Sequence, residues 1–253
     1  MPESGKFIIS LDFELLWGVR DKKNISSYGD NILGVWDVIP KMLKIFENHG
    51  IAATWATVGF LFATSKDEIS NFFPRKKPQY INQNLSPYNG HFETIKNEAD
   101  NYYHFAAELI ELIQKYPLQE IATHTFSHYY CLEAGQKNED FRNDIKSAIK
   151  IALSKNIEIK SLVFPRNQFN KEYLEIIKEL GITSFRGNEK SWYYDPYNFE
   201  NWRLLKRALR LLDSYINISG YNSFPVQKVK KSKPYNIPSS RFLRPFSMTL
   251  KPL

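Results

Sequence analysis

The sequence predicts an α/β protein built on a parallel sheet, with helices packed outside it as an open sheet or a barrel. Two observations point to this class. Short apolar stretches that suit buried strands alternate with stretches whose apolar residues recur at helical spacing, through five strand–helix units. The chain has 253 residues, enough for one such domain with a full core.

The first helix is indicated by an apolar stripe within 35–50. Proline is tolerated only in the first turn of a helix, so Pro40 predicts that the regular helix begins near Asp37. A polar stretch at 66–100 indicates a long insertion over the carboxyl ends of the strands, where loops of α/β enzymes shape substrate access. Strands are expected at 6–15, 51–60, 120–124, 161–165 and 182–187, and further helices at 102–115, 139–154, 171–180 and 199–212.

The charge of the chain is unevenly placed. The formal net charge is +7, yet residues 203–253 hold eleven Lys or Arg residues and a single acid, Asp213. Such a segment is either a solvated basic tail or a surface for an anionic partner: a sugar nucleotide, a lipid-linked phosphate, a membrane face or nucleic acid. No nucleic-acid motif accompanies the charge, which disfavours the last of these partners.

The composition favours a cytoplasmic protein. Hydrophobic residues make up 43% and charged residues 24% of the chain, as is typical of globular proteins. A single cysteine, Cys131, excludes an internal disulfide framework and suits a reducing compartment. Neither a signal peptide nor a stretch long enough to span a membrane is expected.

Two carboxylates, Asp12 and Glu14, lie inside the apolar stretch SLDFELLWG at 10–18. Residues i and i+2 of a strand point to the same face, so both acids are expected to project together near the strand's carboxyl end, where barrel enzymes place their chemistry. Two carboxylates there need a cation or a proton between them. From this stretch alone, a bridge to an Arg or Lys of a neighbouring strand explains them equally well.

Two histidines at the end of another predicted strand favour the functional explanation. In HTFSH, His124 and His128 are four residues apart, so a helical turn starting there would turn both imidazoles towards one metal. Both pairs follow strands of the same sheet and would converge on one rim. Two imidazoles and one carboxylate form a three-ligand set with open positions, which is typical of a catalytic metal, and the remaining carboxylate is free to act as a base.

These motifs resemble those of the polysaccharide deacetylases, the NodB-like carbohydrate esterases. HTFSH matches that family's His-Ser/Thr-x-x-His motif at every position, whereas LDFE spaces by two the acids that are more often adjacent. The resemblance covers about 6–212 and implies an incomplete, distorted (β/α)7 barrel over residues 1–212, lacking its last strand–helix unit. Residues 213–253 are expected to form a basic, Pro-rich segment packed on the barrel or extending from it.

The resemblance also implies roles for individual residues. Asp12 is the expected base and Glu14 the expected metal ligand with His124 and His128, although the two acids could be exchanged. Arg166, in VFPRNQ, takes the place of the family arginine that orients the base. Trp192, in GNEKSW, is the expected wall of the acetyl pocket. A core position for Trp192 and a surface position for Arg166 remain open alternatives, and Cys131 is expected to be a buried, inert thiol.

The implied activity is metal-dependent hydrolysis of an N-acetyl group on a sugar, in cytoplasmic synthesis of a surface polysaccharide. The expected cofactor is one divalent metal ion, with zinc as the first choice and cobalt, nickel or manganese as alternatives. The expected partner is an N-acetylated sugar, a sugar nucleotide or a lipid-linked saccharide. Two other functions stay open: an amide hydrolase for a small non-sugar substrate, and a catalytically impaired carbohydrate-binding or scaffold homologue.

One family feature has no counterpart in this sequence. The family's late Leu-x-His motif supplies the imidazole that protonates the departing amine, but no histidine follows His128. General acid catalysis is typically worth about 10²–10⁴ in rate. We therefore expect a chain that binds metal, turns over slowly and lacks the last part of a family barrel, through truncation or natural loss, unless an acid such as Glu189 or a tyrosine of WYYD substitutes.

Overall fold

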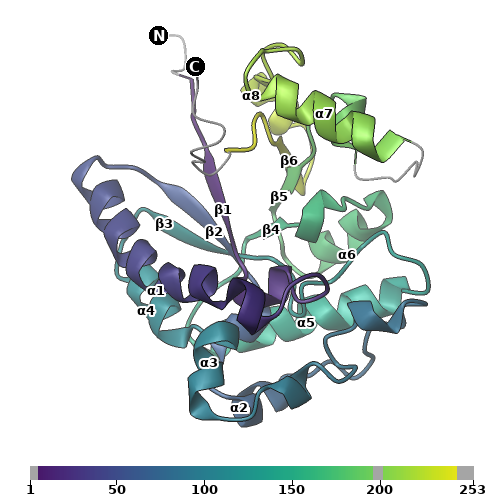
Figure 1. Ribbon diagram of the computed structural model, residues 1–253. Helices are drawn as coiled ribbons and strands as arrows, with labels where there is room; N and C mark the ends of the chain where they lie inside the picture. The colour runs from purple at the N-terminus through teal and green to yellow at the C-terminus, as the bar shows by residue number, and fades with distance from the viewer. Residues whose placement is uncertain (1–4, 196–201, 244–253) are drawn as a thin grey trace.

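The computed structural model describes residues 5–195 and 202–243, and six parallel strands organise them. Every strand pairs with the one that follows it in the chain, so the order in the sheet is β1-β2-β3-β4-β5-β6. The sheet curls into an incomplete barrel with helices outside it (Figure 1), which confirms the predicted fold class. The strands are β1 (Ile9–Phe13), β2 (Ala53–Thr57), β3 (Gln119–Thr123), β4 (Ser161–Val163), β5 (Ser184–Gly187) and β6 (Tyr235–Pro238).

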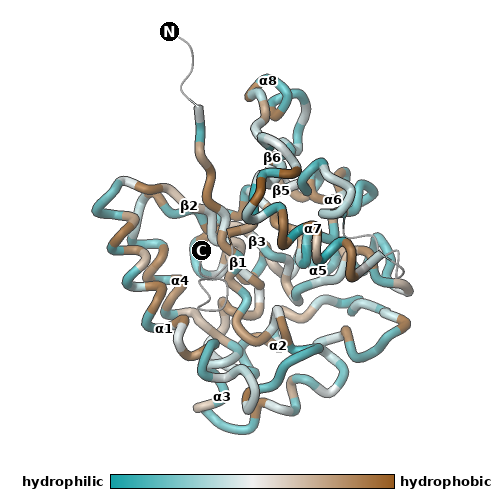
Figure 2. Tube along the Cα trace, turned by 45° about the horizontal axis from the view of Figure 1, so that its top comes forward, coloured by the Kyte–Doolittle hydropathy of each residue, from teal (hydrophilic) through white to brown (hydrophobic). Residues whose placement is uncertain are grey.

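The helices follow the predicted alternation, with short 3-10 turns after several strands. Apolar stretches coincide with the central strands, while polar stretches lie on the outer helices and loops (Figure 2). Within the described residues, no helix is both long and apolar enough to cross a membrane. The helices are α1 (Ile25–Asn48), α2 (Lys66–Ser70), α3 (Glu98–His104), α4 (Ala107–Gln114), α5 (Asn138–Ser154), α6 (Leu174–Glu179), α7 (Arg203–Asp213) and α8 (Val226–Val229).

The predicted start of the first helix near Asp37 is wrong. Helix α1 begins twelve residues earlier, where Asn24 accepts a hydrogen bond from the Ser27 amide and Ser27 accepts one from the Asn24 amide. This capping box satisfies two amides that a helix start leaves unpaired. Pro40 lies inside the helix, where the burial of flanking apolar residues such as Ile39 and Leu43 offsets the hydrogen bond that a proline cannot donate.

The helix predicted at 102–115 is two helices, α3 and α4. The chain is extended at Phe105, and the Ala106 amide donates to the Leu61 carbonyl instead of continuing the helical ladder. The last predicted helix, 199–212, corresponds to α7, and 199–201 lie outside the described residues.

A sixth strand was not predicted. Strand β6 pairs with β5 in the register Ser184 with Tyr235 to Gly187 with Pro238, although the basic segment that contains it was expected to have no strand–helix unit. The strand is only four residues long and ends in a proline, so the alternation of apolar and polar residues is too short to predict it. The sheet therefore extends beyond residue 212, where the sequence placed the end of the barrel.

The 66–100 insertion packs against the loops that leave the carboxyl ends of the strands, as expected. Trp17, which follows β1 and is fully buried, contacts Phe60 and Phe92 with ring centroids 4.5 and 5.2 Å apart. Tyr80 accepts a hydrogen bond from the Tyr130 amide at 2.9 Å. The insertion thus supports the rim from which the predicted site residues come, while its part in substrate access stays a prediction.

Candidate metal centre

Glu14 stands at the point where β1 gives way to a 3-10 turn, Leu15–Gly18. The strand ends at Phe13, so only Asp12 of the two acids lies within it, and the expectation that both sit in one strand is wrong in part. Gly18 leaves room for the Glu14 carboxylate, because a Cβ at this position would overlap the carboxylate atoms. The turn therefore fixes where that carboxylate can lie.

His124 and His128 come from the loop that follows β3, and this loop is not the predicted helical turn. Thr125 and His128 have φ angles of 63° and 54°, in the left-handed region that non-glycine residues rarely adopt. The Thr125 hydroxyl accepts a hydrogen bond from the Tyr129 amide at 2.7 Å, which braces the loop from within. The imidazoles converge because of this irregular backbone, rather than because of helical spacing.

Two neighbouring elements hold the same loop from outside. The Gly59 amide donates to the Thr125 carbonyl at 2.9 Å, and a Cβ on Gly59 would come within 2.7 Å of the Phe126 Cα, so this approach requires glycine. From α5, the buried Asp144 carboxylate accepts hydrogen bonds from the Phe126 amide at 2.7 Å and from the Ser127 hydroxyl.

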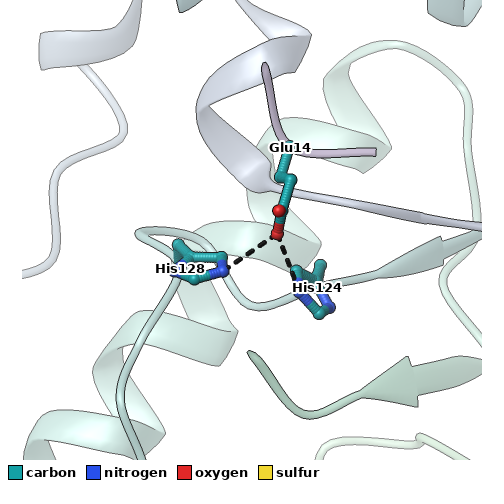
Figure 3. Close-up of side chains that lie close together, drawn as sticks. All are labelled: Glu14, His124 and His128. Atoms are coloured by element: carbon teal, nitrogen blue, oxygen red, sulfur yellow. Dashed lines mark ion pairs between the residues drawn. The ribbon is translucent and has the colours of Figure 1, made fainter. Parts of the chain in front are cut away.

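Glu14, His124 and His128 point at one another (Figure 3). One Glu14 oxygen, Oε2, lies 3.4 Å from Nε2 of His124 and 3.0 Å from Nε2 of His128. Both histidine side chains are buried, whereas the Glu14 side chain keeps a partly open face. Among the described residues this is the one group of three side chains with suitable ligand atoms close together.

The protonation of these groups fits a bound cation. Nδ1 of His124 lies 2.9 Å from the Val163 carbonyl, so this nitrogen carries the proton in neutral His124 and leaves Nε2 with a lone pair facing Glu14. Burial lowers the pKa of His128 to about 4, against the attraction of Glu14, so His128 is neutral near pH 7. Burial opposes the ionisation of Glu14, yet the imidazoles of His124 and His128 beside it hold its pKa well below its usual range.

A carboxylate oxygen and an imidazole lone pair that face each other repel unless a cation or a proton lies between them. Buried Nε2 of His124 has no hydrogen-bond donor within the described part of the chain. A divalent ion bound by one carboxylate and two imidazole nitrogens removes the repulsion and matches the donor set that zinc prefers. The residues present therefore fit a metal.

Asp12 is held by an arginine that the sequence did not identify. Arg186, on β5, forms two hydrogen bonds with the Asp12 carboxylate, at 2.8 and 3.0 Å, and also donates to the Ser10 hydroxyl at 3.0 Å. Strands β1 and β5 are not neighbours in the sheet, so the pair reaches across its curl. A bidentate pair of this kind fixes both the position and the plane of the carboxylate.

The family model described as polysaccharide deacetylase matches residues 21–185. The chain belongs to the polysaccharide deacetylase family. The match covers HTFSH and both histidines, and it begins after Asp12 and Glu14. The structure thus adds the acidic part of the site to the part that the family model recognises.

Several solved structures of low sequence identity match part of this chain. A protein from Mycobacterium smegmatis assigned to the polysaccharide deacetylases is 14% identical, with a TM-score of 0.48 over 76% of this chain and 55% of that one. The deacetylase PplD of Streptococcus pyogenes is 10% identical, with a TM-score of 0.45 over 74% and 57%. A pseudoenzyme of the same esterase family from Bacillus anthracis is 13% identical, with a TM-score of 0.39 over 72% and 43%.

The chain spans about half the length of these three proteins. No curated protein matches it.

Arg166 does not occupy the place that the deacetylase motifs predicted. It pairs with Asp21, and its guanidinium lies 4.4 Å from the centroid of the Tyr130 ring. The prediction that Arg166 lies beside Asp12 is therefore wrong. Arg166 belongs to a 3-10 turn after β4 and has a φ of 55°, and from this turn its side chain reaches Asp21. A sequence rule could have found Arg186: a charged residue inside a strand needs a charged partner, and Arg186 lies in the predicted strand ITSFRG.

Trp192 and Cys131 contact residues other than Glu14, His124 and His128. Trp192 is half exposed and contacts Trp202, with ring centroids 6.5 Å apart, so its role at an acetyl pocket stays a prediction. Cys131 is fully buried and packs in the core, as expected of an inert thiol. His104 is buried against Trp17.

The replacement Gly18→Ala should weaken metal binding without unfolding the protein. The added methyl group must displace the Glu14 carboxylate, a flexible group that can move away from the imidazoles at little cost to the fold. We expect the dissociation constant for zinc, measured by competition with a chelating dye, to rise at least about tenfold. Gly34→Ala is the matched control, because a Cβ there meets nothing within 4 Å. Equal zinc affinities in the two variants would contradict the role given to Gly18.

Asp144 should make stability depend on pH. Burial raises its pKa from 3.8 to about 7, so the folded protein holds a proton that the unfolded chain releases above about pH 4. The contribution of Asp144 to the free energy of unfolding is complete below pH 4. It is lost as the pH rises to about 7, at about 1.4 kcal/mol per pH unit. Asp144→Asn removes this titration. The difference in unfolding free energy between the parent and the variant, from urea titrations of metal-free protein, should change between pH 4 and 7 and level off above pH 7. A constant difference would contradict the assignment.

Proposed function

We propose that this chain is a metal-dependent deacetylase that hydrolyses an N-acetyl group on a sugar. The observation that carries the proposal is the convergence of Glu14, His124 and His128. Asp12, two positions before Glu14 in the sequence, is a further acid, and an arginine holds its carboxylate in place. Three ligands with one partly open face leave room for a substrate and a water molecule. Family membership supports both the reaction class and a saccharide substrate.

The roles of the residues follow from their contacts. A divalent ion in this site would polarise the acetyl carbonyl and lower the pKa of a bound water. Glu14 contacts both imidazoles and so is the ligand, which leaves Asp12 to accept the proton of the attacking water. Arg186 holds the Asp12 carboxylate in one orientation, and the Val163 carbonyl keeps His124 in the tautomer that offers Nε2.

The identity of the metal and the setting of the reaction are parts of the proposal. Zinc suits two imidazoles and one carboxylate, and cobalt, nickel or manganese would also be accepted. We propose a cytoplasmic role in the synthesis of a surface polysaccharide, on an N-acetylated sugar, a sugar nucleotide or a lipid-linked saccharide. The single buried cysteine and the family membership support this setting.

A catalytically impaired, saccharide-binding role is the second candidate, favoured by the missing late histidine. No histidine of this chain follows His128, so an imidazole of the chain cannot protonate the departing amine from that position. Glu189 is the first substitute: it follows β5 by two residues, and burial raises the pKa of its carboxyl, which favours the protonated form that an acid requires.

Acetate release tests the proposal directly. Zinc-loaded protein should release acetate slowly from N-acetylglucosamine oligomers, sugar nucleotides or lipid-linked saccharides, and Asp12→Asn should lower kcat about 10²–10⁴-fold while zinc content is unchanged. If zinc and saccharide bind but no acetate is released, the impaired role is correct. A brisk rate with a basic limb in the pH profile would point to a working acid, and Glu189→Gln is then the variant to compare.

Replacing Arg186 and Arg166 in separate variants distinguishes two effects of an arginine: holding the Asp12 carboxylate in one orientation, and simply adding positive charge to the protein. Arg186→Gln removes both hydrogen bonds to Asp12 and should lower kcat about 10–100-fold with little change in KM. Arg166→Gln removes the same charge but leaves the Asp12 pair intact, and its kcat should stay within about threefold of the parent. Melting temperatures of both variants control for folding. A larger loss of kcat in Arg166→Gln would restore the role that the sequence gave to Arg166.

A further inference from the structure

Helix α7 lies on the protein with its polarity reversed. Its charged residues Lys206 and Asp213 are 6% and 1% exposed, while its leucines face solvent. Leu204 is 78% exposed and Leu212 is 48% exposed, and Leu205 and Leu211 are exposed as well. An amphipathic helix of a globular protein normally buries the apolar face and exposes the charged one.

The buried polar contacts explain this orientation. The Lys206 ammonium donates to the Asp195 carbonyl at 3.1 Å. The Asp213 carboxylate accepts hydrogen bonds from the Tyr194 hydroxyl at 2.9 Å, from the Ser219 amide at 2.6 Å and from Arg241 at 2.8 Å. Turning the helix over would bury the leucines but would break these contacts.

The exposed leucines form one continuous stripe. With 3.6 residues per turn, positions 204, 205, 208, 211 and 212 fall within about a third of the helix circumference. Trp202, just before the helix, is half exposed and packs edge to face with half-exposed Trp192. Ile216, just after the helix, is exposed too. Figure 2 shows apolar and polar stretches along α7. We call residues 192, 202, 204, 205, 211, 212 and 216 the leucine face.

The charge around the leucine face selects its occupant. Arg207 is exposed and lies next to the stripe on the helix wheel, and residues 203–253 carry eleven basic residues against a single acid, Asp213, which is buried. A second copy of the chain would bring two such basic segments together at a cost in repulsion. An anionic lipid surface offers acyl chains to the leucines and negative charge to the arginines and lysines, and tryptophans are enriched at that boundary.

We propose that the leucine face of α7 docks on an anionic membrane surface, with the helix lying in the plane of the lipid headgroups. Helices with a basic flank and a stripe of Leu and Trp bind this interface without spanning the membrane. The inference does not depend on the metal site, and it can hold whether or not the chain is a deacetylase.

Flotation of the full-length chain with vesicles tests the proposal. The protein should bind vesicles of phosphatidylcholine with about one third phosphatidylglycerol at least about tenfold more tightly than phosphatidylcholine alone. Leu204→Gln/Leu212→Gln should lower this binding about tenfold at unchanged net charge, and Leu204→Glu/Leu212→Glu about 100-fold. Circular dichroism and melting temperatures verify that the variants are folded.

Leu118→Glu/Leu153→Glu is the matched control, because these leucines are 50% and 55% exposed, lie outside α7 and change the net charge equally. Its binding should stay within about threefold of the parent. The proposal is wrong if the parent does not bind anionic vesicles, or if the control loses as much binding as the Glu variant. It is also wrong if the Gln variant binds as the parent does, which would mean that charge alone holds the protein. A parent dimer that the Gln variant dissociates would assign the leucine face to a second copy instead.

Discussion

Two buried imidazoles can face one carboxylate in this protein only because residues 124–128 keep an irregular backbone. Left-handed φ angles at Thr125 and His128 cost about 1–2 kcal/mol each for residues with side chains, so the loop must be held by its surroundings. The turn after β2 holds it through Gly59, and α5 holds it through Asp144. The packing of β2, β3 and α5 around this loop therefore serves one purpose, which is to turn His124 and His128 towards Glu14.

The sequence sufficed to find the three side chains of the candidate metal centre because the chemistry of these residues constrains them locally. HTFSH and LDFE carry the ligand types within a few residues of a strand end, and a parallel sheet brings strand ends to one rim without further information. The partner of Asp12 is different. Whether Arg166 or Arg186 reaches Asp12 depends on the curl of the sheet and on the φ of a single turn residue, and neither follows from local pattern. An assignment by motif position selected Arg166, whereas the need of a strand carboxylate for an opposite charge would have pointed to Arg186.

The predicted ends of helices and strands are wrong where tertiary contacts override the local conformational preference of the residues. Pro40 predicts a helix start in isolation, but a capped first turn and burial of α1 against the sheet carry the helix through it. Strand β6 is too short and too polar to be recognised alone, and it exists because β5 offers it a free edge to pair with. The periodicity of α7 correctly indicated a helix but not its orientation, because Asp213 and Lys206 bind protein groups that no pattern of hydropathy records.

The candidate metal centre and helix α7 differ in which side chains they bury. The first buries polar groups, whereas α7 exposes apolar ones. The candidate metal centre buries both of its imidazoles, and a metal bound there would depend on fixed ligand geometry and therefore on rigid neighbours such as β3 and α5. The leucine face exposes its apolar side chains beside Arg207, so the proposed membrane contact would depend on apolar area and on the electrostatic field rather than on precise placement of single atoms. The acid excess of residues 1–202 and the basic excess of residues 203–253 follow the same division. Because Asp213, the single acid of that basic segment, is buried and holds α7, no acidic side chain is exposed among the described residues 203–243.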